Sequence, residues 1–308
     1  MKHGHDHGHT HDHAGRVDTA LRDSAAGIRA VKISLIALGI TALLQVAIVV
    51  TSGSVALLAD TIHNFSDALT AIPLWIAFSL SRRSATRRYT YGLGRAEDLA
   101  GLFVVAVIAV SAVVAAIQAI DRLFHPVPVS HIGWVAAAGL AGFVGNEIVA
   151  VYRIRVGRRI GSAALRADGM HARADGLTSL AVVLGAVGVA LGFPAADPII
   201  GLIIAAAILV VMVVAARDVF ARLLDSVDPA LVDTAYHTLE HQPGVIGVQR
   251  VRMRWIGLRL DADVELDVDP QLSLRQAHDL AHHAEHALTH AIPKLDTAVV
   301  HAYSAHAH

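Results

Sequence analysis

Residues 99–120 read LAGLFVVAVIAVSAVVAAIQAI, a run that contains no Asp, Glu, Lys or Arg. About 20 apolar residues, each rising about 1.5 Å along a helix, cross a bilayer core roughly 30 Å thick. Residues 33–59, 176–196 and 198–216 form three more charge-free runs. The whole chain is 55% hydrophobic and 17% charged, with a mean hydropathy of +0.54. The sequence therefore predicts an α-helical membrane protein.

Two further apolar stretches, residues 54–80 and 132–152, contain acidic side chains. The charge-free run before the first of them continues directly into it, so we place a helix boundary near Thr51-Ser52-Gly53. The fifth helix is expected to begin near Ser162, before its charge-free half. Six membrane helices are therefore predicted, within a transmembrane domain of residues 29–222.

Lys and Arg cluster before the first expected helix, between the second and third, and between the fourth and fifth. These basic residues are Arg16, Arg22, Arg29, Lys32, Arg82, Arg83, Arg87, Arg88, Arg95, Arg153, Arg155, Arg158, Arg159 and Arg166. The opposite side has one, Arg122. Because cytoplasmic loops are enriched in basic residues, we expect both termini to be cytoplasmic. We place this multi-pass protein in a bacterial inner membrane.

The composition also limits the chemistry that the chain can perform. No Cys is present among the 308 residues, which excludes disulfides, thiolate zinc clusters and thiol catalysis. The net charge of −1 gives no general electrostatic attraction for nucleic acid. His is unusually frequent, with 20 copies, and it is both a metal ligand and the side chain that titrates near neutral pH. Metal or proton handling is therefore the opening hypothesis.

Two groups of His lie outside the expected membrane helices. Residues 1–28 begin with alternating His, Gly, Asp and Thr, and they lack the apolar run of a cleavable signal peptide. We expect a disordered cytoplasmic tail that either captures zinc loosely or is a dispensable solvated segment. Near the other end, His278, His282, His286 and His290 repeat every four residues. That stripe is either a solvated helix face or a zinc chelate.

Residues 223–308 differ in composition, because charged and apolar residues alternate there. Two such alternating segments, joined by a turn at Ile256-Gly257, predict a β-hairpin in which Arg252 faces Asp261. The same register places Arg250 opposite Asp263. With the flanking helices and a last strand, this soluble domain is expected to be an αββαβ unit, which buries little by itself and favours a partner.

One motif occurs in two of the expected membrane helices. Residues 59–67 read ADTIHNFSD and residues 167–175 read ADGMHARAD, so both follow the pattern A-D-x-x-H-x-x-x-D. Residues four apart share a helix face, so each motif presents one His nitrogen beside one Asp oxygen. The two helices run in opposite directions, and together they supply two His and two Asp, a set that suits tetrahedral Zn²⁺. The predicted ligands are His63, Asp67, His171 and Asp175.

Each motif has another acid, Asp60 or Asp168, three residues before its His. These carboxylates either accept a hydrogen bond from a ligand His or carry protons. The alternative is a structural role, as a helix cap or an interhelical hydrogen bond. Intramembrane acids are costly, at about 2.5–3.5 kcal/mol each at the centre of a helix, and are functional by default.

The paired motifs, the loop RYTYGLGRAE at residues 88–97, the six spans and the αββαβ domain together resemble the cation diffusion facilitator (cation efflux) family, in its zinc-exporting branch. The resemblance covers nearly the whole chain after about residue 30. It implies a homodimeric Zn²⁺/H⁺ antiporter with a ferredoxin- or metallochaperone-like cytoplasmic domain. It also implies that His63, Asp67, His171 and Asp175 form the transport site.

The resemblance has further implications for single residues. Arg95 and Asp225 would form a charge interlock near the dimer seam. A cytoplasmic metal site would use Glu265, His278 and His301, with a structural polar network as the alternative. Some relatives bind metal in the cytoplasmic loop through His, but this chain has Tyr89 and Leu93 there, so we predict no metal at that place.

The function that follows is secondary active export of Zn²⁺ from the cytoplasm, driven by protons. The alternatives are an exporter of a broader set of divalent cations (Cd²⁺, Co²⁺, Ni²⁺) and a membrane metal sensor that does not transport. An intramembrane metalloprotease would need H-E-x-x-H, which the sequence lacks, so we predict no enzyme activity. No cofactor is expected, since Zn²⁺ is the substrate.

Overall fold

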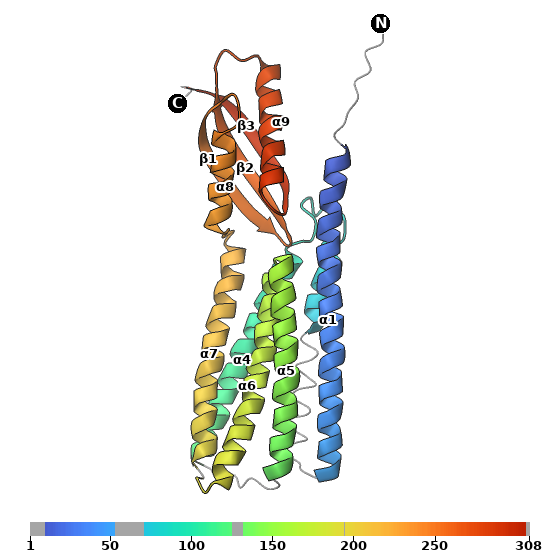
Figure 1. The fold of residues 1–308 in the computed structure, drawn as a ribbon, viewed down its shortest axis with the longest axis vertical. Helices are drawn as coiled ribbons and strands as arrows, with labels where there is room; N and C mark the ends of the chain where they lie inside the picture. The colour runs from blue at the N-terminus through green and yellow to red at the C-terminus, as the bar shows by residue number, and fades with distance from the viewer. Residues whose placement is uncertain (1–9, 53–70, 125–131, 194, 306–308) are drawn as a thin grey trace. The chain divides into compact units, whose positions relative to one another are not determined.

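The computed structural model describes residues 10–52, 71–124, 132–193 and 195–305. The chain divides into two compact units. The membrane unit contains residues 25–84 and 95–220, and the cytoplasmic unit contains residues 1–24, 85–94 and 221–308. Figure 1 shows the helices and strands of both units.

The described part of the membrane unit is entirely helical, apart from short connections. Its helices are α1 (Thr10–Ser52), α3 (Ala71–Ser81), α4 (Ala96–Phe124), α5 (Ile132–Ile160), α6 (Ala163–Ala190) and α7 (Ala196–Leu223), of which the start of α1 and the end of α7 belong to the other unit. Five of them, all but α3, are long and apolar enough to cross a membrane. The predicted multi-pass helical architecture is confirmed. Most of the expected second span, residues 54–80, lies outside the described residues, which include only its end as α3.

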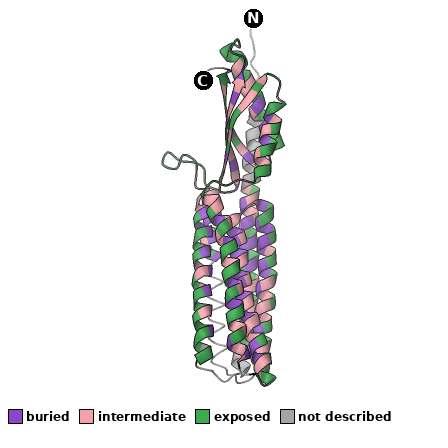
Figure 2. Cartoon of the chain, turned by 90° about the vertical axis from the view of Figure 1, so that its left-hand side faces the viewer, coloured by how far each residue is buried: buried purple, intermediate pink, exposed green. Residues whose placement is uncertain are grey.

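The outer surfaces of these helices are apolar. Large hydrophobic side chains such as Leu43, Val110 and Ile203 are more than half exposed, at 70%, 63% and 62%. Figure 2 shows exposed positions along the outside of the bundle and buried positions facing neighbouring helices. Such a surface would be unfavourable in water but is well solvated by lipid tails.

Helix α1 differs from the expected start of the transmembrane domain. It begins at Thr10, so residues 10–28, which we expected to be disordered, are helical in the structure. Residues 1–9 lie outside the described part. The end of this segment makes two contacts: Asp23 pairs with Lys294 at 3.0 Å, and Gly27 approaches so closely that a Cβ there would lie 2.8 Å from the Phe78 ring.

Among the described helices of the membrane unit, α5 and α6 form the most extensive contact. We expected residues 153–166 to include a basic loop, but α5 continues to Ile160 and only Gly161 and Ser162 separate it from α6. Gly161 has a positive φ of 73°, and the Ser162 hydroxyl accepts a hydrogen bond from the Leu165 N–H at 3.0 Å. This tight turn brings Arg153 into a helix instead of a loop.

The cytoplasmic unit has the predicted αββαβ order. Its elements are α8 (Pro229–Glu240), β1 (Val245–Ile256), β2 (Arg259–Val268), α9 (Leu274–Ala291) and β3 (Leu295–Ser304). Strand β1 pairs antiparallel with β2, and β2 pairs parallel with β3 (Figure 1). Apolar side chains of both helices and one sheet face form the core, including Leu239, Leu260, Val264 and Leu288. The opposite face of the sheet carries the charged residues.

The hairpin register differs by two residues from the predicted one. Arg254, not Arg252, lies opposite Asp261; Arg252 lies opposite Asp263, and Arg250 opposite Glu265. The turn is Gly257-Leu258 instead of Ile256-Gly257, because Gly257 adopts a positive φ of 61°. Opposite charges still face one another across the strands, as predicted, whereas the predicted turn and the two predicted residue pairs were wrong.

The hairpin tip packs against residues 85–94 of the same unit. The Gly257 carbonyl accepts a hydrogen bond from Arg222 Nη2 at 2.8 Å, and the Arg222 guanidinium lies 4.2 Å from the centre of the Trp255 ring. A Cβ on Gly257 would lie 2.7 Å from the carbonyl oxygen of Gly94. Backbone approaches backbone here, so a side chain has no room.

Gly257→Ala should therefore detach residues 85–94 from the hairpin. We expect a loss of at least about 1–2 kcal/mol in local stability, because the left-handed backbone alone costs that much for a residue with a Cβ. Hydrogen exchange of residues 85–94 and 250–260 in the full-length protein measures the effect. Gly247→Ala in β1, which would meet only the movable Asp267 side chain, is the control and should change little.

Asp261 provides a pH-dependent prediction in the same domain. Burial raises the pKa of its carboxyl above the ordinary 3.8, and the nearby Asp296 carboxylate raises this pKa further. A raised folded-state pKa favours folding below the unfolded value, and this contribution is lost as pH rises through the folded value. Asp261→Asn should therefore stabilise the domain by a fraction of a kcal/mol at pH 7.5 and give a smaller gain near pH 4.

Hydrogen exchange of the β2 and β3 amides, compared with the native protein at each pH, tests this prediction. Asp263→Asn is a matched control, because Asp263 is on the same strand and face but is exposed. Equal protection of the Asp261→Asn and native proteins at neutral pH would contradict it.

Candidate metal centre

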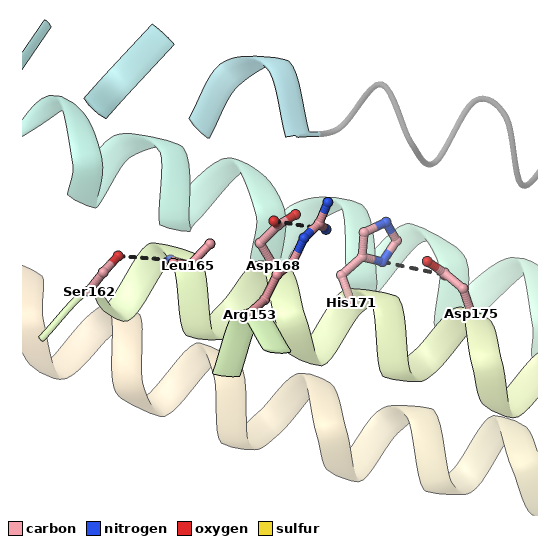
Figure 3. A network of polar contacts seen from close by, with 6 residues as sticks. All are labelled: Arg153, Ser162, Leu165, Asp168, His171 and Asp175. Atoms are coloured by element: carbon pink, nitrogen blue, oxygen red, sulfur yellow. Dashed lines mark hydrogen bonds and ion pairs between the residues drawn. The ribbon is translucent and has the colours of Figure 1, made fainter. Parts of the chain in front are cut away.

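Helix α6 places the second copy of the repeated motif in the interior of the membrane unit. Asp168, His171 and Asp175 are 0%, 1% and 5% exposed. Spacings of three, four and seven residues bring all three to one face of the helix. The Nδ1 atom of His171 lies 3.5 Å from Oδ1 of Asp175, as Figure 3 shows. The predicted His–Asp pair is therefore formed, with one nitrogen and one oxygen side by side.

The pair faces a small cavity between three helices. Its lining residues are Leu38, Thr41, Ala42 and Gln45 of α1, Asn146 and Arg153 of α5, and His171, Ala172 and Asp175 of α6. Polar groups therefore gather here although the surrounding helices are apolar. Gln45 donates from Nε2 to the Ala138 carbonyl at 3.4 Å, as an interhelical hydrogen bond. A cation entering this cavity would meet imidazole and carboxylate donors.

The other half of the predicted site, His63 and Asp67, and the neighbouring Asp60 lie outside the described residues. Within the described ranges, no three His, Asp or Glu side chains form a group that could hold a metal ion. The four-ligand site thus stays a prediction, for which the structure places two of the four side chains.

Asp168 pairs with a residue that the sequence analysis did not single out. Arg153 Nη1 of α5 lies 2.9 Å from Asp168 Oδ2, and Arg153 is only 2% exposed. We had counted Arg153 among the loop residues. Arg153 follows Asn146 by seven residues, and residues seven apart share a helix face. This spacing could have indicated that the two polar side chains lie on one face of the same helix. Asp168 therefore makes an interhelical contact, which was one of the structural alternatives for this residue.

A second ion pair joins the same two helices. Arg173 of α6 donates from Nε to Glu147 Oε2 at 3.1 Å and from Nη2 to Oε1 at 2.6 Å. The two side chains are 39% and 34% exposed, unlike the buried Arg153 and Asp168. Arg173 and Glu147 are not among the residues that line the cavity.

The three residues of the predicted cytoplasmic metal site are not brought together within one chain. Glu265 and His301 are register partners on β2 and β3, on the sheet face opposite the helices. His278 is exposed on α9, whose buried residues pack on the other face. Glu265 forms an ion pair with Arg250. Successive side chains of a strand point to opposite faces of the sheet. Glu265 and His301 therefore lie on one face, whereas α9, which carries His278, packs on the other.

Other predicted residues have local partners. Arg95 lies 3.8 Å from Asp98, and the interlock of Arg95 with Asp225, which belong to different units, stays a prediction. In the His stripe of α9, the rings of His278 and His282 have centroids 4.6 Å apart, and His282 Nδ1 lies 3.3 Å from Glu285.

The fold is that of a multi-pass membrane protein with a polar cavity between its helices. Residues 31–224 match the family model of the cation efflux transmembrane domain, and residues 227–303 match that of the cation efflux protein cytoplasmic domain. The chain therefore belongs to the cation efflux (cation diffusion facilitator) family, and it is a cation efflux transporter.

Several known proteins are similar to this chain over most of its length. The probable cation efflux system protein Rv2025c of Mycobacterium tuberculosis is 67% identical over 292 residues, or 95% of this chain and 88% of that protein. Metal tolerance protein 2 of Oryza sativa subsp. japonica is 27% identical over 266 residues, covering 77% and 68%. The magnetosome protein MamM of Paramagnetospirillum magneticum is 29% identical over 238 residues, covering 74% and 73%.

Solved structures similar to this chain include the MamM CTD. The nickel form of one variant is 28% identical and covers 25% of this chain and 98% of that chain, with a TM-score of 0.25. The family assignment rests on the sequence comparisons.

Proposed function

We propose that this protein exports Zn²⁺ from the cytoplasm in exchange for H⁺, through a site formed by His63, Asp67, His171 and Asp175. The observation that carries the proposal is the buried His171–Asp175 pair, which lines a polar cavity between membrane helices. The same motif occurs once more, at residues 59–67. A site needs a counter-charge for its two carboxylates, and a divalent cation supplies it.

The ligand set supports zinc as the principal substrate. Two imidazole nitrogens and two carboxylate oxygens suit a tetrahedral Zn²⁺ site, whereas Mn²⁺ and Mg²⁺ favour oxygen ligands. Cd²⁺, Co²⁺ and Ni²⁺ accept similar donors, so a broader divalent cation exporter is the second candidate. A sensor that does not transport is less well supported, because its ligands would not need to be buried in the membrane unit.

The proposal includes the setting in which the transporter works. We place it in the bacterial inner membrane as a homodimer, with both termini in the cytoplasm. The charged face of the three-stranded sheet is available for a second subunit, and basic residues cluster in the segments assigned to the cytoplasmic side. Transport requires no cofactor and no enzymatic step in this proposal.

Metal flux into proteoliposomes tests the substrate. We expect rapid uptake of Zn²⁺, slower uptake of Cd²⁺, Co²⁺ or Ni²⁺, and little uptake of Mn²⁺. All ions are measured with one preparation of proteoliposomes, so that the proportion of protein inserted in each orientation is the same. Equal rates for all five ions would favour the broader exporter. Binding of Zn²⁺ without any flux would favour the sensor.

A further inference from the structure

The buried ion pair between Arg153 and Asp168 lies beside the candidate metal site but is not part of the predicted ligand set. Its atoms are 2.9 Å apart, and its two residues are 2% and 0% exposed (Figure 3). The desolvation cost of a buried ion pair can cancel its Coulomb energy, so such a pair is weak evidence for a role in stability. In a membrane helix, a charged residue is a candidate for a functional role.

The position of the pair connects it with the metal site. Arg153 lines the same cavity as His171 and Asp175. Asp168 precedes His171 by three residues on α6, which is nearly one helical turn. A permanent positive charge therefore lines the cavity, and a third carboxylate lies about one helical turn from His171.

The charge balance of the site depends on that third carboxylate. Asp67 and Asp175 together neutralise one divalent cation. A further free carboxylate would give the site an excess negative charge, which binds cations more tightly and delays their release. It would also favour ions that prefer oxygen ligands, such as Mn²⁺.

We propose that Arg153 is a specificity-determining residue of the transport site: by holding the Asp168 carboxylate in an ion pair, it withholds this third carboxylate from the transported cation. The site then keeps two carboxylates and two imidazoles, which favours Zn²⁺ over Mn²⁺ and permits release. The inference rests on the proposed function, because it assumes that His63, Asp67, His171 and Asp175 together bind the cation.

Association of α5 with α6 does not depend on this pair alone. The bidentate contact between Arg173 and Glu147 joins the same helices. The helices also approach closely at Gly169, where a Cβ would lie 2.8 Å from Ile154 Cγ1. Arg173 therefore provides a matched control, since it makes an α5–α6 ion pair outside the cavity lining.

The test uses the full-length protein in detergent, with Zn²⁺ and Mn²⁺ titrated by calorimetry. Asp175→Ala, measured in parallel, gives the binding that belongs to other parts of the chain. Arg153→Met should free Asp168 and raise Mn²⁺ affinity about tenfold, with a smaller rise for Zn²⁺. Asp168→Asn should leave the guanidinium unneutralised and lower the affinity for both ions about tenfold.

The double variant Arg153→Met/Asp168→Asn should return both affinities to within about threefold of the native values, because charge and counter-charge are removed together. Arg173→Met should leave the ratio of Mn²⁺ to Zn²⁺ affinity unchanged. A purely structural pair would behave differently, since both single variants would weaken binding. Weaker binding by both single variants would therefore overturn the inference. An unchanged ratio of Mn²⁺ to Zn²⁺ affinity in Arg153→Met would overturn it too.

Arg153→Met leaves an unpaired buried carboxylate and is the variant most prone to unfold, so a second comparison is included. Asp168→Asn and the double variant differ only in the guanidinium. About tenfold weaker binding by Asp168→Asn supports the inference, and equal binding overturns it. A failure of the proposed function would give a different result, because Asp175→Ala would then bind Zn²⁺ with the same affinity as the native protein.

Discussion

Asp175→Ala should abolish cation transport, with flux reduced by more than about a hundredfold. Asp175 is buried, lies 3.5 Å from His171 and lines the cavity between α1, α5 and α6. Removing even a residue that only supports a metal ligand costs about 10- to 100-fold, and Asp175 is a proposed ligand. The substitution leaves three ligands and one uncompensated charge for a divalent ion. Zn²⁺ uptake into proteoliposomes measures the loss.

A matched control separates the loss of a ligand from a failure to fold. Asp121 is an acid near the end of α4 that is exposed, so Asp121→Ala should keep transport near the native level. Size-exclusion chromatography and helical content should be the same for both variants. Normal flux through Asp175→Ala would remove Asp175, and with it the predicted ligand set, from the mechanism.

The elements that were predictable from sequence follow from simple periodicities. Charge-free runs such as residues 198–216 gave the membrane helices, because a bilayer requires about 20 apolar residues per span. The alternation of apolar and charged residues in β2 predicted a strand of the hairpin, because successive side chains of a strand point to opposite faces. The spacing of His171 and Asp175 gave the pair, because four residues make about one helical turn.

The errors arose where tertiary contacts determine the outcome. The length of α1 before residue 28 depends on partners far along the chain, such as Lys294 for Asp23. The assignment of Arg153 to a loop followed from treating basic residues as the end of a span. A buried acid on the next helix instead allows this guanidinium to lie inside the membrane unit. The hairpin register changed because Gly257 adopts a positive φ, which its neighbours do not predict.

Proton coupling is the second large effect that we expect. Zn²⁺ binds neutral imidazole and ionised carboxylate, so protons compete with the metal for the same atoms. Apparent Zn²⁺ affinity should therefore fall steeply between pH 7.5 and 5.5, a range centred near the ordinary His pKa of about 6.5. The same competition should let a proton gradient, acidic on the side to which Zn²⁺ is delivered, drive Zn²⁺ uphill.

Replacing both His63 and His171 by Asp separates proton competition at the ligands from other effects of pH. Carboxylates have ordinary pKa values near 4, so the loss of affinity should move to lower pH in this variant. The move will be smaller than the difference between the reference values, since neighbouring carboxylates titrate as a coupled group. Calorimetry at several pH values gives the affinities, and vesicles with and without a protonophore give the dependence of flux on the gradient. A native affinity that is independent of pH, together with a flux indifferent to the gradient, would make the protein a facilitated zinc channel, because exchange against protons requires that the two cations exclude one another at a shared site.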